Sequence, residues 1–109
     1  MERFRLDFER SLALHEAVAQ EVLLHPEIIE RARRKLEEWL RSGGRSAPLW
    51  LRWQRILERP TDEVAAFLME RSEEAAWLRK ASPFAGVLPP GTRLRILRGV
   101  RERLGRMPG

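Results

Sequence analysis

The fold is decided by residues 8–23, FERSLALHEAVAQEVL, because their apolar residues recur at helical spacing. Successive helical residues lie about 100° apart around the axis, so positions three and four apart share one face. That face contains Phe8, Leu12, His15, Ala19, Val22 and Leu23. The pattern predicts a first helix over residues 1–24 with one buried side. The pair His25-Pro26 ends it, because a residue before proline is displaced from helical dihedrals.

Further helices follow, each bounded by proline, glycine or a capping residue. Pro26 is favoured at the start of a second helix, which Gly43 and Gly44 close. The N-caps of the remaining helices are predicted at Ser46 or Ala47, Thr61, Ser72 and Thr92. Their inward faces are predicted to include Ile29, Leu36, Trp53, Trp77, Leu78 and Val100. We therefore expect an all-α protein with one compact, bundle-like domain of five or six helices over residues 1–109.

The positive charge of the chain comes almost entirely from arginine. There are 21 basic and 16 acidic residues, a net charge of +5, and the basic residues are 19 Arg and 2 Lys. An arginine-rich chain without asparagine fits a high-GC or a thermophilic source, so a solvated arginine surface already accounts for the high pI. The basic excess lies in residues 41–60 and 81–109.

This uneven charge leaves a nucleic-acid-binding regulator as the alternative function. Arginines on the last helix and in the middle of the chain are positioned to contact phosphates. The candidate residues are Arg52, Arg55, Arg95, Arg98 and Arg103. Base readout needs polar groups such as Asn and Gln on the inserted helix, and the last helix has almost none.

No pattern in the chain predicts catalysis. There is no cysteine, and the two histidines, His15 and His25, are ten residues apart, so no metal site is expected. Ser11 precedes His15 by one helical turn, yet no third group is evident to orient the imidazole. His15 is instead predicted to be a buried, hydrogen-bonded structural residue. We expect a protein that is not an enzyme, without cofactor, metal or small-molecule substrate.

Some apolar residues exceed what the predicted core requires. Leu51 falls opposite the apolar face of its helix, and the loop over residues 82–88 is unusually apolar. Such a loop either plugs the fold or contacts a partner. The candidate partner-binding residues are Leu51, Met69, Ser82, Pro83, Phe84, Val87 and Leu88. We therefore expect a protein–protein interaction module that binds a partner protein or a second copy of the chain.

Two segments carry a resemblance to a group of known proteins. They are residues 8–15, FERSLALH, and residues 82–88, SPFAGVL, with Trp39-Leu40 between them. In these segments the chain resembles short bacterial all-helical proteins, some of which are similar to the antitoxin partners of toxin–antitoxin pairs. The resemblance implies a protein that binds and silences another protein. The charged N-terminal residues and the lack of a long apolar run predict a cytoplasmic, not membrane-bound, location.

Overall fold

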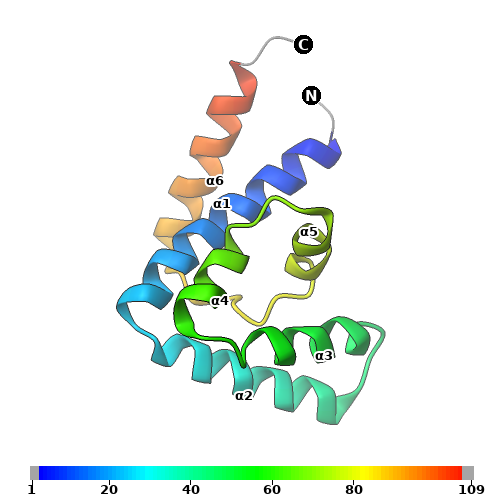
Figure 1. Cartoon of the computed structure of the whole chain (residues 1–109). Helices are drawn as coiled ribbons and strands as arrows, with labels where there is room; N and C mark the ends of the chain where they lie inside the picture. The colour runs from blue at the N-terminus through cyan, green and yellow to red at the C-terminus, as the bar shows by residue number, and fades with distance from the viewer. Residues whose placement is uncertain (1–2, 107–109) are drawn as a thin grey trace.

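Six α-helices form the structure of residues 3–106, which are the residues that the computed structural model describes (Figure 1). They are α1 (Arg3–Leu24), α2 (Glu27–Ser42), α3 (Ala47–Ile56), α4 (Thr61–Leu68), α5 (Glu73–Arg79) and α6 (Pro90–Gly105). Within residues 3–106 there is no β-strand. The predicted all-α, bundle-like architecture is therefore confirmed.

Helix α1 organises the fold because α2, α4, α5 and α6 pack against it, while α3 packs against α2. It contacts α4 and α6 most extensively, and α5 and α2 as well (Figure 1). Its buried residues are Leu12, His15, Val18, Ala19 and Val22. The predicted stripe is thus correct in its middle and differs at both ends, since Phe8 is only half-buried and Leu23 is exposed. Leu23 lies about 100° around the axis from buried Val22, and only the Val22 side of the last turn is covered.

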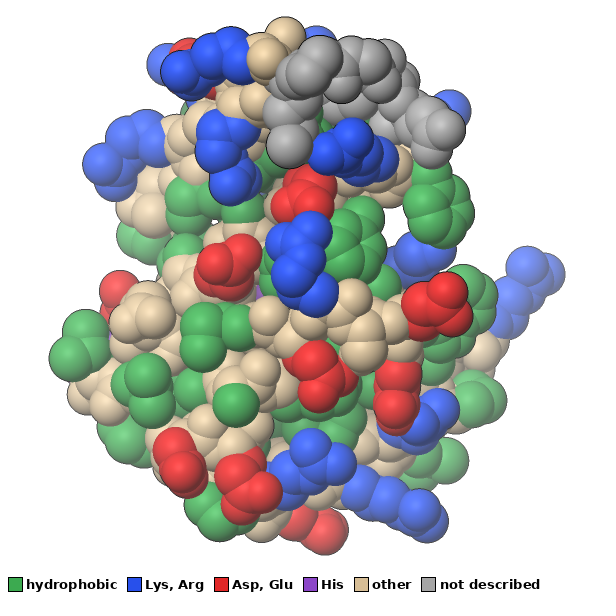
Figure 2. Space-filling model, turned by 45° about the horizontal axis from the view of Figure 1, so that its top comes forward, with side chains coloured by type: hydrophobic (Ala, Val, Ile, Leu, Met, Phe, Trp, Pro, Cys, Tyr) green, Lys and Arg blue, Asp and Glu red, His purple; other side chains and the backbone are tan. Residues whose placement is uncertain are grey.

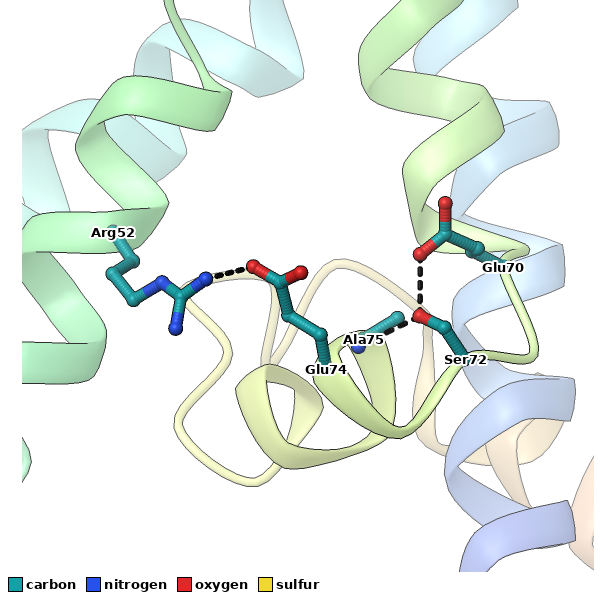
Figure 3. A network of polar contacts seen from close by, with 5 residues as sticks. All are labelled: Arg52, Glu70, Ser72, Glu74 and Ala75. Atoms are coloured by element: carbon teal, nitrogen blue, oxygen red, sulfur yellow. Dashed lines mark hydrogen bonds and ion pairs between the residues drawn. The ribbon is translucent and has the colours of Figure 1, made fainter.

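Helix ends follow the prolines and glycines of the sequence. Gly43 has a φ of 75° and donates its backbone N–H to the Trp39 carbonyl, which closes α2 as predicted. Ser72 caps α5, its hydroxyl accepting the Ala75 N–H at 3.1 Å (Figure 3).

The predicted caps at Thr61 and Thr92 are wrong. Pro60 and Pro89 occupy the N-cap positions of α4 and α6, with ψ values of 152° and 149°. The extended dihedrals of each proline set the direction of entry, so the helix begins at the next residue. In α6 that residue is Pro90, which has no N–H to leave unpaired in the first turn.

The core is centred on Trp53, which is fully buried. Its indole Nε1–H donates to the Leu78 carbonyl at 2.8 Å. Its ring meets Phe67 and Phe84 edge-on, at centroid distances of 5.6 and 5.8 Å. One side chain of α3 therefore holds together α4, α5 and the segment between α5 and α6.

The other tryptophans lie nearer the surface. Trp39 and Trp50 are half-buried and pack on each other, with centroids 5.4 Å apart. The prediction that Trp77 faces inward is wrong, because its side chain is 58% exposed. The buried residues of α5 are Ala75, Leu78 and Arg79, which define an inward face centred about 150° around the helix axis from Trp77.

Candidate functional site: an aromatic patch and a basic groove

Large apolar side chains are exposed at several places on the surface. Leu51 and Met69, both predicted to be surplus to the core, are exposed. Sequence reasoning missed two exposed aromatic residues: Phe4, which is 79% exposed, and Trp77, which is 58% exposed. Among residues 3–106, the remaining large apolar side chains that are exposed are Leu23, Leu24 and Leu94.

Phe4 and Trp77 form what we call the aromatic patch, together with Lys80. The Lys80 Nζ lies 4.8 Å from the Trp77 ring centroid and 5.9 Å from that of Phe4. The beginning of α1 and the end of α5 thus present two aromatic rings beside one cation. Trp is one of the residues enriched in binding hot spots, and Phe is enriched in the cores of protein–protein interfaces.

The loop predicted as a partner-binding segment packs largely onto the fold. Pro83 and Phe84 are buried, so neither presents a surface to a partner, whereas Ser82, Val87 and Leu88 are half-buried. Val87 and Leu88 pack against the core. The Lys35 Nζ on α2 also donates to the Ala85 carbonyl at 2.9 Å. The loop therefore acts as a plug.

His15 fixes the start of this loop. It is buried, as predicted, with Nδ1 2.8 Å from the Ser11 carbonyl oxygen and Nε2 2.8 Å from Ser82 Oγ. A carbonyl can only accept, so Nδ1 carries the proton and Nε2 accepts from the Ser82 hydroxyl. Ser82 Oγ in turn accepts the Phe84 N–H at 3.1 Å. Sequence reasoning considered Ser11, but it contributes its carbonyl, and the hydroxyl partner lies 67 residues away.

The His15 imidazole is neutral at physiological pH. Burial lowers its pKa from 6.5 to about 4, which the Ser11 hydrogen bond opposes and the charges of Arg79 and Arg93 reinforce. The ring therefore contributes hydrogen bonds but no positive charge to its surroundings.

A groove of about 670 Å³, which we call the basic groove, runs beside the His15–Ser82 pair. Its walls come from one flank of α1, from residues 79–88 and from the first turns of α6. Its charged lining is Arg10, Arg79, Lys80 and Arg93, against one carboxylate, Asp7. Lys80 belongs both to this groove and to the aromatic patch.

Arg79 is unusual because its charged side chain is almost completely buried, with 4% of the residue exposed. Its Nη1 donates to the Glu70 carbonyl at 2.7 Å, and its guanidinium lies 5.5 Å from the Phe8 ring centroid. Its Nε and Nη2 have no hydrogen-bond partner. Burial, followed by the charge of Arg71, lowers the pKa of Arg79 from its usual value. The side chain was not predicted to have any role.

A second groove, of about 530 Å³, lies between the beginning of α1 and the end of α6. It is lined by Arg5, Glu9, Arg71, Arg103, Leu104 and Arg106. Arg71 pairs with Glu9 and lies 5.3 Å from the Phe8 ring centroid. The hydrogen bond to Glu9 raises the pKa of Arg71 further. Figure 2 shows Lys and Arg side chains gathered at this end of the molecule, with hydrophobic side chains scattered between the charges below.

The arginines predicted for nucleic-acid binding do not form one surface. Arg52, on α3, pairs with Glu74 on α5 (Figure 3), and Arg55 is on the same helix. Arg95, Arg98 and Arg103 are on α6, which extends away from α3 (Figure 1). The predicted set is thus divided between two helices, with Arg95, Arg98 and Arg103 together on one of them.

Residues 3–106 contain neither a cluster of metal-ligating side chains nor a helix suited to span a membrane. Among these residues, no group of three His, Asp or Glu side chains is placed to hold a metal ion. Over the same residues, no helix combines the length and apolar character that crossing a membrane requires. No known protein family, curated protein or solved structure matches this chain. The fold and surface define a compact all-helical domain that bears an exposed aromatic patch beside a basic groove.

Proposed function

We propose that the protein is a non-catalytic interaction module that binds a partner protein through the aromatic patch. The observation that carries this proposal is the joint exposure of Phe4 and Trp77, both of whose rings lie near the Lys80 Nζ. A partner that covers these two rings would remove a large apolar area from water. Burial of aromatic side chains contributes much of the binding free energy at interfaces.

The charges beside the patch favour an acidic partner. Within residues 3–106, Lys80 has no carboxylate at ion-pair distance, and Arg10, Arg79 and Arg93 share its groove. A second copy of the chain docking through the same patch would bring the two Lys80 groups together, which like-charge repulsion opposes. The favoured occupant is therefore a different protein, with apolar side chains flanked by Asp or Glu.

The resemblance to antitoxin-like bacterial proteins adds a role to this binding. A domain that occupies an acidic, apolar surface of a toxin would keep that toxin inactive in the cytoplasm. The proposal is thus a small antitoxin-like regulator whose activity is the occlusion of its partner.

Capture of a partner by variants of the patch tests this function. Tagged wild-type protein, Phe4→Ala, Trp77→Ala and Leu24→Ala are compared after nuclease treatment of the lysate. Leu24 is a matched control for Phe4 because it is also highly exposed, at 71%, and lies at the opposite end of the same helix.

The patch variants are expected to lose about tenfold or more in partner affinity, as hot-spot truncations do, while Leu24→Ala binds like the wild type. Equal retention by Trp77→Ala and Leu24→Ala would overturn the proposal. A purified protein that sediments as a dimer, and that Trp77→Ala converts to monomer, would assign the patch to a second copy instead.

A nucleic-acid-binding regulator is the second candidate, favoured by the charge of α6. This helix carries five arginines and one glutamate, and Arg93, Arg95, Arg98, Arg101 and Arg103 are all exposed. Fluorescence anisotropy with a labelled DNA duplex across a salt series measures the contribution. Arg98→Gln should reduce the salt slope by about one if it contacts a phosphate, whereas Arg34→Gln on α2 should not. Binding that vanishes at physiological salt would contradict this candidate.

A further inference from the structure

The basic groove has the size of a ligand-binding site. Its volume of about 670 Å³ lies within the range of pockets that hold small organic molecules. Three separate segments close around it, namely one flank of α1, residues 79–88 and the beginning of α6. The His15–Ser82 hydrogen bond and the burial of Phe84 hold the middle segment in place, so the groove is preformed.

The groove has a surplus of positive charge that the protein does not neutralise. Among the described residues, none of the four cations Arg10, Arg79, Lys80 and Arg93 forms an ion pair within 4.0 Å. Asp7 is the one carboxylate in the lining, and the neutral His15 adds no charge.

Unsatisfied donors are present at the same place. Arg10 Nε and Arg79 Nε and Nη2 are buried without a hydrogen-bond partner, and Arg79 is 96% buried because only 4% of it is exposed. A guanidinium has donors only, so these groups can be satisfied by an acceptor, and most strongly by an anion. The carboxylates of Glu70, Glu16 and Glu9 act on Arg79 only from beyond ion-pair distance, so they leave these donors unpaired. Buried donors without an acceptor are costly, and a bound anion would remove that cost.

The remaining lining of the groove is apolar. It includes Leu14, Val18, Phe84, Leu88 and Leu97. An inorganic anion alone would leave these side chains facing water, whereas an organic anion would cover them and bury apolar surface of its own.

From these features we infer that the basic groove binds a small organic anion, a carboxylate or phosphate monoester attached to an apolar body. The acid group lies among Arg10, Lys80 and Arg93, and the apolar body lies along Leu14, Leu88 and Leu97. Ser82 donates its hydroxyl proton to His15 and is not activated for chemistry on the ligand. This binding goes beyond the proposed partner contact and does not depend on it.

Calorimetric titration with four probes tests the inference. The probes are octanoate, octyl phosphate, inorganic phosphate and octyl glucoside, the last being neutral with the same apolar chain. Octanoate or octyl phosphate should bind saturably, and whichever binds more tightly identifies the acid group. Inorganic phosphate and octyl glucoside should each bind at least about tenfold more weakly, because each lacks one half of the recognition.

Two arginine variants on α6 locate the site. Arg93→Gln removes a cation of the groove, while Arg98→Gln removes an exposed arginine of the same helix that does not line it. Arg93→Gln should weaken binding about tenfold, and Arg98→Gln should leave it within about twofold. Amide chemical-shift changes should centre on Ala85, Gly86 and Leu97.

Three results would overturn the inference. One is the lack of saturable binding by both octyl anions at millimolar concentration. Another is equal affinity for octyl glucoside, since charge would then play no part. The third is equal weakening by Arg93→Gln and Arg98→Gln, which would mean diffuse attraction to a basic surface. Because no partner protein is present in these titrations, a negative result would not bear on the aromatic patch. That proposal is tested separately, by capture of a partner.

Discussion

The two halves of α1 lie in different surroundings. From Leu12 to Val22 the helix buries four apolar residues and His15 against α2, α4 and α6, whereas none of residues 3–11 is buried. In this first half, the guanidinium groups of Arg71 and Arg79 lie over the ring of Phe8, which is half-buried. One helix thus enters the core at one end and forms part of a basic, aromatic surface at the other.

This difference separates stability from binding. Burial of apolar area provides most of the folding free energy, whereas an exposed cation–π contact contributes only about 0.5–1 kcal/mol. Substitutions in the core half should therefore unfold the protein, and substitutions in the basic half should spare the fold. The same contrast between buried and exposed side chains is expected across the other helices.

The two tryptophans Trp53 and Trp77 give the largest contrast. Trp53→Ala removes a fully buried ring and its hydrogen bond to Leu78, which should cost about 3–5 kcal/mol in the free energy of unfolding. Trp77→Ala removes an exposed ring and should cost less than about 1 kcal/mol. Urea denaturation followed by circular dichroism measures both. Similar losses for the two variants would show that the core is not centred on Trp53.

The buried His15 makes stability depend on pH. Its pKa is about 4 in the folded protein and about 6.5 when unfolded, so the unfolded chain binds the extra proton first. The contribution is fully present above pH 6.5 and is lost as the pH falls towards 4, up to about 3 kcal/mol. Urea denaturation between these pH values should show this slope, and His15→Gln should flatten it. An unchanged slope in His15→Gln would assign the pH dependence to carboxylates.

The cap of α5 should have an intermediate effect. Ser72→Ala removes the hydroxyl that accepts the Ala75 N–H, which should lower the free energy of unfolding by about 1 kcal/mol. Ser42→Ala, the same change at the exposed last residue of α2, is the control and should be close to neutral. Thermal unfolding of both proteins measures the difference. Equal shifts in Tm would mean that the cap does not stabilise α5.

The smallest effect is expected for the ion pair between Arg52 and Glu74. Both side chains are more than half exposed, so water and salt screen their attraction. A double-mutant cycle with Arg52→Gln and Glu74→Gln should give a coupling free energy below about 1 kcal/mol that decreases as salt is added. A larger coupling that salt leaves unchanged would contradict this expectation.

Local patterns were sufficient to predict most of the fold. The stripe from Leu12 to Val22, the glycines after α2 and the prolines before α4 and α6 are all signals within a few residues of the helix ends they determine. The errors are local as well. Trp77 was placed on the inward face because α5 has only seven residues, too few for a stripe to distinguish one side from another.

The candidate sites depend on contacts between distant segments, which no local pattern contains. Ser82 hydrogen-bonds His15 across 67 residues of sequence. Phe4, in the first turn of α1, contacts Lys80, which directly follows α5. The burial of Arg79, which leaves its Nε and Nη2 without an acceptor, follows from the packing of α5 on α1, since its sequence neighbours resemble those of any exposed arginine. The apolar loop was recognised as unusual, but only the position of Phe84 beside Trp53 shows that it is a plug.

The hydrogen bond of the Trp53 indole also makes its proton a hydrogen-exchange probe for the opening of the core. A proton held at 2.8 Å from a carbonyl, on a ring without contact to water, can exchange with deuterium only when the surrounding segments separate. The indole proton of exposed Trp77 has no such barrier. Both indole protons can be followed in one series of spectra after transfer to deuterated water. The ratio of the Trp53 lifetime to the Trp77 lifetime therefore measures how rarely the core opens, without denaturant or substitution.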